Sequence, residues 1–432
     1  MMEAYITILK EELVPAMGCT EPIALAYGAA KLREALGEIP ERIEVGASGS
    51  IIKNVKSVIV PNTGHLKGIE AAIAVGIIAG NASKELEVIQ KVSKEQKVEL
   101  KNYLDKTPIS VNYLDTDLNF DIQIKGFGKK DEAAIRIANY HTNVVYIEKN
   151  GEVLFTKPFI GESEEGLTDR SILNMTGIYE FATTCELTDE ITGLLDRQIQ
   201  YNMAIAQEGI DGSYGANIGS VLLGAYGNGI ENKAVAYASA GSDARMNGCE
   251  MPVVINSGSG NQGITCSVPV IVYGRETNAS EESIYRALLL SNLTAIHQKT
   301  GIGRLSAFCG AVCAGVAAGG GIAYLKGGKK DEVFHTVVNG LAIVSGMVCD
   351  GAKASCAAKI AMSIQSGLLG YHMFICGEEF KGGDGIISKG IENTIVNIGR
   401  LGKKGMQITN QEIIHIMLND GKENCGDEGS CD

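Results

Sequence analysis

Three cysteines near the end of the chain are the residues best suited to metal chemistry. Cys309 lies in the Gly- and Ala-rich stretch 305–313, and Cys349 and Cys356 share the stretch 346–356. Small neighbours leave room beside each sulfur for a bulky group. Three thiolates suit a [4Fe–4S] cube with one iron that the protein leaves unbound, and such an iron is a Lewis acid for substrate oxygen or sulfur.

The spacing of these cysteines excludes two common metal motifs. Zinc ribbons use paired C-x2-C knuckles, and ferredoxin runs bring their ligands into one short loop. The alternative is that the three cysteines are small buried hydrophobic residues, since free cysteine packs well in a core.

Cys19 stands far from the other three, directly before a helix that begins near Thr20, Glu21 and Pro22. A thiol at this place meets the positive end of the helix dipole and free N–H groups, which favour the thiolate. We therefore expect a lowered pKa and a role as a base. A semi-buried cysteine at a helix entry is the alternative.

Two loops could bind a substrate carboxylate. The first is the Gly-rich segment 256–263, in which Ser257, Ser259 and Asn261 stand beside backbone N–H groups that can form an anion nest. It lacks the lysine of a P-loop and the spacing of a dinucleotide fingerprint, so a plain turn is the alternative. The second loop follows an expected strand and offers Asn62, His65 and Lys67 to a carboxylate. A solvated turn is the alternative.

Composition restricts the partners. The 432 residues carry a net charge of −13, no tryptophan and no block of basic residues, which argues against nucleic acid and anionic membranes as partners. The N-terminus does not resemble a signal peptide, and eleven cysteines are an odd number, so we expect free thiols in the cytoplasm. The uncharged stretch 305–325 contains three consecutive glycines, which predicts a buried helix plus a turn rather than a membrane span.

The elements that must position these residues predict an α+β fold. Periodicity gives a small α/β module with a mainly antiparallel sheet, then a large all-helical module. The hairpin around Asn150 and Gly151 is the strongest turn signal. We expect N-terminal helices with the Cys19 motif in 1–39, the α/β module in 40–160, the helical module in 161–418 and a flexible acidic tail in 419–432.

The helices and strands expected from periodicity can be set out by residue range. The helices are 3–13, 23–36, a segment ending near 79, 190–206, 281–299, 330–344 and 411–418, and the strands are 42–45, 57–60, 109–114, 120–125, 133–140 and the hairpin 143–155.

Four motifs stand out when the chain is taken as a whole. They are Gly18-Cys-Thr-Glu-Pro-Ile-Ala24, Ser257-Gly-Ser-Gly-Asn-Gln-Gly263, Leu305-Ser-Ala-Phe-Cys-Gly310 and Met347-Val-Cys-Asp-Gly-Ala-Lys-Ala-Ser-Cys356. Together they resemble one family, the L-cysteine desulfidases, which are related to the iron–sulfur L-serine dehydratases through their α-chain domain. The motifs occur in the family's order, and the resemblance covers about residues 11–418.

The resemblance implies a [4Fe–4S] enzyme without pyridoxal phosphate that converts L-cysteine to pyruvate, ammonia and sulfide. It makes Cys309, Cys349 and Cys356 the cluster ligands and Cys19 the base. Cys313, one helical turn after Cys309, competes as a ligand, although the Phe-Cys-Gly match favours Cys309.

The expected partner is a small amino-acid substrate, and a homodimer is left open. An L-serine dehydratase with the same cluster is the second hypothesis. An iron–sulfur or redox sensor without enzymatic activity is a third, and a pyridoxal enzyme a fourth. We expect the tail cysteines Cys425 and Cys431 to have no role; in the sharper alternative, a tail thiolate caps the open iron.

Overall fold

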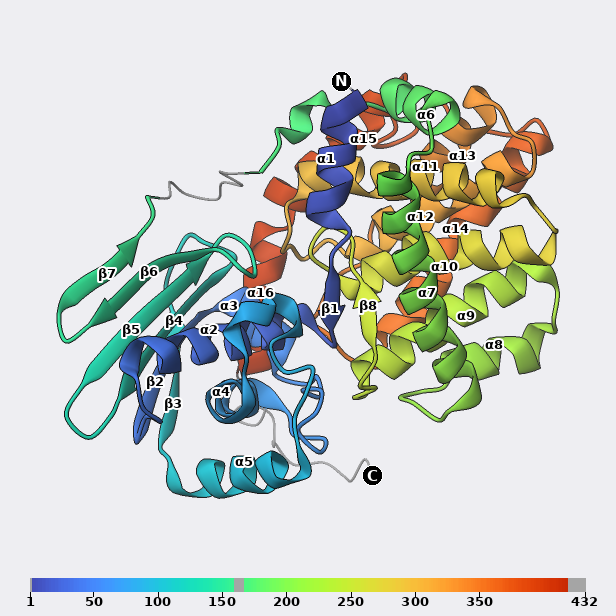
Figure 1. Ribbon diagram of the computed structural model, residues 1–432. Helices are drawn as coiled ribbons and strands as arrows, with labels where there is room; N and C mark the ends of the chain where they lie inside the picture. The colour runs from blue at the N-terminus through green and yellow to red at the C-terminus, as the bar shows by residue number, and fades with distance from the viewer. Residues whose placement is uncertain (1, 159–166, 419–432) are drawn as a thin grey trace, which may run out of the picture.

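The computed structural model describes residues 2–158 and 167–418, so the tail cysteines Cys425 and Cys431 lie outside the described part. The molecule has two parts, a six-stranded sheet with its covering helices and a larger assembly of helices beside it (Figure 1). This arrangement confirms the expected α+β class.

The sheet is mainly antiparallel, as the alternating sequence pattern predicts. Its strand order is β3-β2-β4-β5-β6-β7, and only the pair β2–β3 is parallel. Alternate residues of β4 and β5 are buried, which turns one face of the sheet toward its helices. The strands are β2 (Arg42–Ser48), β3 (Ile109–Leu114), β4 (Asp121–Phe127), β5 (Glu132–Ala138), β6 (Val144–Lys149) and β7 (Glu152–Thr156).

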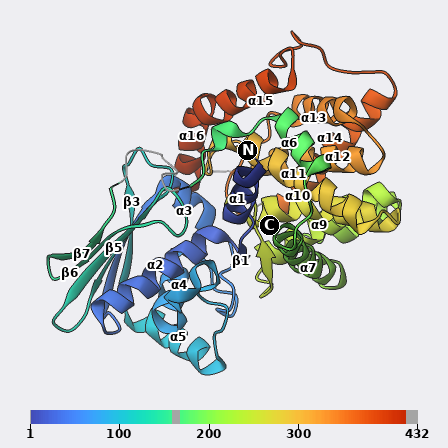
Figure 2. The same ribbon diagram turned by 45° about the horizontal axis from the view of Figure 1, so that its top comes forward.

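Helices of the small part pack on this one face. Figure 2 shows α2 (Thr20–Leu36), α4 (Gly68–Ala79) and α5 (Lys94–Lys106) together on one side of the sheet. Helix α2 contacts β4 and β5 directly and α4 lies beside α2. The N-terminus of α2 lies next to the helical part, so Cys19, its N-cap residue, is near the boundary between the two parts.

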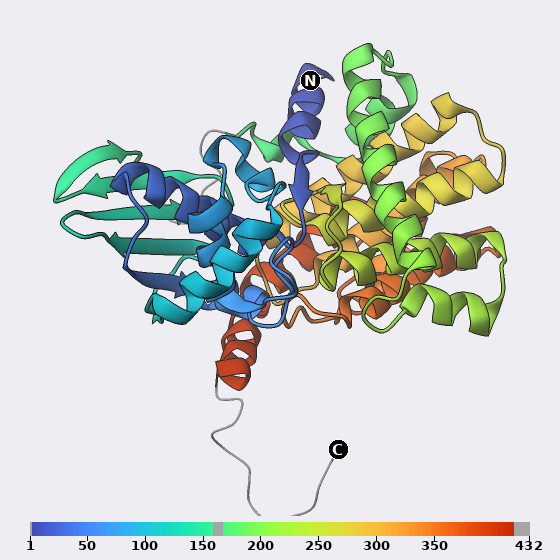
Figure 3. The ribbon, with the colours of Figure 1, turned by 60° about the horizontal axis from the view of Figure 1, so that its bottom comes forward.

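The first and last helices cross this boundary. Helix α1 (Met2–Glu12) packs on the helical part, and β1 (Pro15–Met17) pairs there with β8 (Pro252–Val254). Thus α1 and α2, which we expected in one N-terminal unit, lie on different parts of the molecule. Helix α16 (Gln407–Leu418) returns to the small part and contacts α3 (Gly49–Val55), as Figures 1 and 3 show.

The helical part is built around α12 (Gly310–Leu325), which is buried along almost its whole length. A Cβ added at Gly319 would lie 2.6 Å from the backbone of Gly367, so glycine allows α12 and α14 to pack backbone to backbone. The remaining helices are α6 (Met175–Thr184), α7 (Asp189–Asp211), α8 (Ile218–Tyr226), α9 (Ile230–Met246), α10 (Gly260–Glu276), α11 (Glu281–Ile302), α13 (Lys330–Val344), α14 (Cys356–Ile375) and α15 (Ile391–Arg400).

Two local expectations from the sequence are wrong. The turn expected at the three glycines 319–321 is absent, because close packing with neighbouring helices keeps them inside α12. The strand expected over 57–60 is reduced to one isolated bridge between Ile59 and Lys67, after a short helix, α3, that the sequence did not indicate. Among the described residues, no helix is long and apolar enough to cross a membrane.

Candidate active site

One pocket gathers the four cysteines singled out from the sequence. Cys19 from the small part lines it together with Cys309, Cys349 and Cys356 from the helical part. Cys19 and Cys309 are buried, and Cys349 and Cys356 are half-buried. Residues almost 340 positions apart along the chain therefore share one cavity at the boundary between the two parts.

Backbone hydrogen bonds fix two of these cysteines side by side. The amide of Cys309 donates to the Met347 carbonyl over 3.1 Å, and the amide of Cys349 donates to the Ala307 carbonyl over 2.7 Å. Phe308 and Val348 form an antiparallel bridge between the two segments. The two loops thus behave as a short ribbon that presents both thiols to the same cavity.

Four helices begin at the pocket. Cys19 and Cys309 are the N-cap residues of α2 and α12, Ser259 is the N-cap of α10, and Cys356 is the first residue of α14. Helix N-termini carry free N–H groups and partial positive charge, which favour bound anions. The pocket is therefore suited to negatively charged groups.

Three lysines from three helices add positive charge around the cysteines. Burial lowers the pKa of Lys53 and of Lys299, whereas the nearby cysteine thiolates oppose this shift. Lys359 lies near Cys309 and Cys356, and its ion pair with Asp350 keeps its pKa raised despite burial.

Two of these lysines also hold the loop that carries Cys349. Lys53 Nζ donates to the Cys349 carbonyl over 3.2 Å, and Lys359 Nζ donates to the Val348 carbonyl over 2.9 Å. The third, Lys299, makes no such bond among the residues described.

The donor set fits an anionic thiolate cluster. Burial and the Cys349 charge raise the pKa of Cys309 to about 12, and burial raises the pKa of Cys356. Thiolates here need a cationic partner, which a metal centre provides. Among the described residues, no three His, Cys, Asp or Glu side chains are grouped closely enough to hold a single metal ion.

Cys19 differs from its expected state. Its thiol is 3% exposed and donates to Glu21 Oε2 over 3.1 Å. Burial and the Glu21 carboxylate raise the pKa of Cys19 well above its usual range, so the expected lowering by the helix dipole is wrong. Desolvation of the thiolate outweighs the dipole at this depth. The resting residue is a thiol.

Glu21 is the ionised partner of this thiol. Burial alone would raise the pKa of Glu21, but His141 and the Cys19 thiol hold it at about 2. His141 Nε2 lies 3.9 Å from Glu21 Oε1, the distance of an ion pair rather than a hydrogen bond. Asn54 Nδ2 donates to the same oxygen over 3.0 Å. A buried carboxylate is thus kept charged beside the cysteines.

The Gly-rich loop contributes two of its three predicted residues to the pocket. Ser259 and Asn261 line it at the start of α10. Ser257 does not, and its hydroxyl instead donates to the Asn256 side chain over 2.9 Å. The loop backs onto Arg304, because a Cβ at Gly258 would lie 3.0 Å from Arg304 Nη1.

The second predicted carboxylate loop lies elsewhere. Asn62 and His65 line a different pocket, and Lys67 is exposed at the start of α4. The Asn62 amide donates to the Ile89 carbonyl over 2.8 Å, so this side chain supports the local fold. None of these three residues lines the cysteine pocket.

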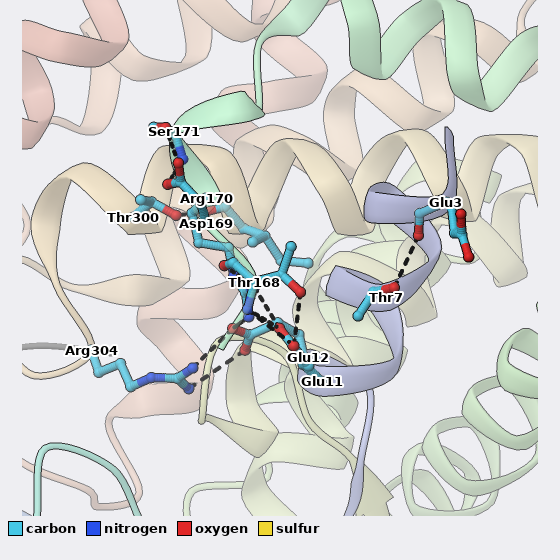
Figure 4. A network of polar contacts seen from close by, with 11 residues as sticks. Glu3, Thr7, Glu11, Glu12, Thr168, Asp169, Arg170, Ser171, Thr300 and Arg304 are labelled. Atoms are coloured by element: carbon cyan, nitrogen blue, oxygen red, sulfur yellow. Dashed lines mark hydrogen bonds and ion pairs between the residues drawn. The ribbon is translucent and has the colours of Figure 1, made fainter. Parts of the chain in front are cut away.

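A buried ion-pair network holds Arg304 at the pocket wall (Figure 4). Glu12 accepts from Arg304 and from Arg170, each over 2.9 Å, and Arg170 also pairs with Glu11. Burial would raise the pKa of Glu12, but the two guanidinium groups lower it. Thus α1 braces a residue of the candidate site from outside the pocket.

Sequence reasoning missed several charged and amide residues of this pocket. Lys299 had one readable signal, since it continues the apolar stripe of α11 between Ile296 and Ile302, where a lysine is unusual. The contacts of Asn54 and Arg245 depend on tertiary packing and gave no signal. Cys313, the competing ligand, is fully buried and does not line the pocket.

Comparison with known proteins shows the family. The family model described as serine dehydratase alpha chain matches residues 83–415. The chain belongs to the serine dehydratase alpha-chain family. This match covers the helical part, three of the four pocket cysteines and most of the sheet.

Relatives match along the whole chain. A UPF0597 protein of Desulfitobacterium hafniense is 58% identical over 96% of this chain and 97% of its own length. A UPF0597 protein of Treponema denticola is 48% identical over 97% of this chain and 98% of its own length. The serine dehydratase alpha-chain family indicates a lyase of the iron–sulfur kind, whereas the relatives' names specify no activity.

Proposed function

We propose that this protein is an iron–sulfur lyase that converts L-cysteine to pyruvate, ammonia and sulfide. The convergence of Cys309, Cys349, Cys356 and Cys19 in one pocket carries the proposal. The three helical-part cysteines would hold a [4Fe–4S] cluster, whose open iron supplies Lewis-acid chemistry for the leaving sulfur. Helix N-termini and buried lysines around the thiols support an anionic group at this place.

Cys19 acts as the base that removes the substrate's α-proton. Its thiol must first lose a proton to solvent as the substrate binds, because Glu21, a much weaker base, does not accept it. A substrate ammonium placed beside Glu21 would offset the carboxylate charge that opposes the thiolate. Once formed, a thiolate of raised pKa is a strong base, which suits a weakly acidic C–H group.

The rest of the pocket orients the substrate and limits water. Ser259 and Asn261 offer neutral donors to the carboxylate at the start of α10. Holding both ends of the substrate fixes the α-proton relative to Cys19, which converts binding energy into orientation. The aminoacrylate product is released and hydrolyses to pyruvate and ammonia.

An L-serine dehydratase is the second candidate, and the description of the matching family favours it. The same pocket would then eliminate water in place of hydrogen sulfide. Cys19 and the carboxylate donors would keep their roles, so the leaving group alone separates the two candidates.

The test is anaerobic reconstitution with iron and sulfide, followed by pyruvate measurement with L-cysteine and with L-serine. A higher kcat/KM for L-cysteine, with about one sulfide released per pyruvate, supports the desulfidase. A higher kcat/KM for L-serine supports the dehydratase. A fully loaded protein that releases pyruvate from neither substrate would exclude both.

A further inference from the structure

Within residues 2–158 and 167–418, four polar side chains that line the cysteine pocket have atoms that can form hydrogen bonds but have no partner. Each residue is at least nine-tenths buried, and Lys299 is 4% exposed. Leaving such groups unpaired costs free energy, so their gathering at one cavity points to a ligand that pairs with them. Three of these atoms, Asn54 Oδ1, Arg245 Nε and Gln262 Oε1, are themselves buried, and the fourth is Lys299 Nζ, for which the described residues offer no hydrogen bond.

Neighbouring charges fix which of the amide atoms face a ligand. A carboxylate can only accept, so the bond from Asn54 Nδ2 to Glu21 leaves Asn54 Oδ1 as a free acceptor. A guanidinium can only donate, so the bond from Arg245 Nη1 to Asn261 Oδ1 over 3.1 Å leaves Asn261 Nδ2 as a donor. The hydrogen-bonding character of the pocket is therefore known at both places.

The pocket thus offers two opposite kinds of partner. Lys299 and Asn261 supply a cation and a donor, while Glu21 and Asn54 supply a carboxylate and an acceptor. A simple anion would leave the acceptors unpaired, and a simple cation would leave the donors unpaired. A ligand with both charges pairs with Lys299, Asn261, Glu21 and Asn54 together.

We propose that the pocket binds a zwitterionic α-amino acid by both charged ends, with its carboxylate at Lys299 and Asn261 and its ammonium at Asn54 Oδ1 and Glu21. The inference rests on the function proposed above, because it takes the cysteine pocket as the active site. It assigns roles in substrate binding to Lys299 and Asn54, which lie outside every motif read from the sequence, and to Glu21 of the Cys19 motif. The β-substituent of the amino acid is then left to face the thiols.

The competing role for Lys299 is to neutralise the cysteine thiolates. Lys53 and Lys359 are already fixed to carbonyls of the loop that carries Cys349, whereas Lys299 Nζ has no partner among the described residues. This difference favours a ligand contact for Lys299. The two roles predict different measurements, because neutralisation affects iron content and ligand binding affects substrate affinity.

The experiment is anaerobic calorimetry on the reconstituted enzyme with three unreactive probes. L-Alanine carries both charges and no leaving group, propionate lacks the ammonium, and ethylamine lacks the carboxylate. We expect L-alanine to bind at least about 10-fold more tightly than either of the other two, since each charged hydrogen bond contributes about a factor of 10 to 100. Equal affinity for L-alanine and propionate would overturn the ammonium site.

Variants then assign each end. Lys299→Met should weaken L-alanine and propionate by about 10- to 100-fold and leave ethylamine unchanged, while Asn54→Leu should weaken L-alanine and ethylamine and leave propionate unchanged. Lys101→Met and Asn393→Leu, at exposed positions outside the pocket, are matched controls. Iron content and the thermal midpoint show whether each variant is loaded and folded.

Two outcomes would contradict the inference without bearing on the lyase activity. One is unchanged L-alanine affinity in Lys299→Met, and the other is loss of iron in that variant with parent affinity in the remaining loaded fraction. Conversely, variant-sensitive L-alanine binding by an enzyme that releases no pyruvate would keep the binding site and reject the proposed function.

Discussion

Glu12→Gln tests how far the buried network of α1 supports the candidate site. The Glu12 side chain is 4% exposed and is shared by Arg170 and Arg304. Gln keeps the shape of the side chain but removes its negative charge, so the buried guanidinium groups of Arg170 and Arg304 lose their shared carboxylate partner. Removing one partner of a buried ion pair costs about 3–5 kcal/mol. With an unfolding entropy of roughly 2.1 cal/mol/K per residue, 432 residues give about 0.9 kcal/mol/K. We therefore expect Tm to fall by roughly 3–6 °C.

The pH dependence of this effect has a definite sign. Because the folded pKa of Glu12 is lowered, its stabilisation is complete above the ordinary carboxyl pKa of 4.5 and is lost as pH falls through the folded value. The difference in Tm between parent and Glu12→Gln should thus be full at pH 7 and shrink below about pH 4.5. Calorimetry at both pH values measures it, with Glu3→Gln on the exposed face of α1 as control. A variant that melts within about 1 °C of the parent at pH 7 would refute the reasoning.

Two further predictions concern the cysteines. After reconstitution, cluster iron should be absent from each of the variants Cys309→Ala, Cys349→Ala and Cys356→Ala. The variant Cys313→Ala should keep its iron, because Cys313 does not line the pocket. Iron analysis measures this, and loss of iron in Cys313→Ala with retention in Cys309→Ala would reverse the ligand assignment. The variant Cys19→Ser should keep the iron and the fold but lower kcat by about 10²–10⁴-fold, as expected for loss of a general base. Stopped assays of pyruvate formation from L-cysteine measure kcat, and near-parent turnover would exclude Cys19 as the base.

The sequence predicts elements well where local rules decide. The helix expected over 281–299 is found as α11, with Ser280 as its N-cap, and α13 has the expected bounds of Lys330 and Val344. Local rules fail where neighbours decide. The glycines of α12 stay helical because α14 packs against them, and no pattern within α12 contains that information.

The candidate site divides in the same way. Motif spacing picked out Cys19 and the three helical-part cysteines, and the structure brings all four together. The protonation state of Cys19 could not be predicted, because the depth of burial and the ionised Glu21 depend on the assembled fold. The partners Asn54 and Lys299 became visible only once unpaired atoms could be counted in a shared cavity.

The pairing of β1 with β8 has a consequence for synthesis on the ribosome. Pro15 and Val254 are partners in this small ladder, so the first segment made must wait for one that emerges about 240 residues later. At 5–20 residues per second the delay is roughly 10–50 s. During that time the apolar face of α1, which includes Ile8 and Leu9, is not yet covered by the helices that bury it in the finished protein. Helix α1 is therefore the segment that stays uncovered longest, whereas all six strands of the large sheet have been made by residue 156.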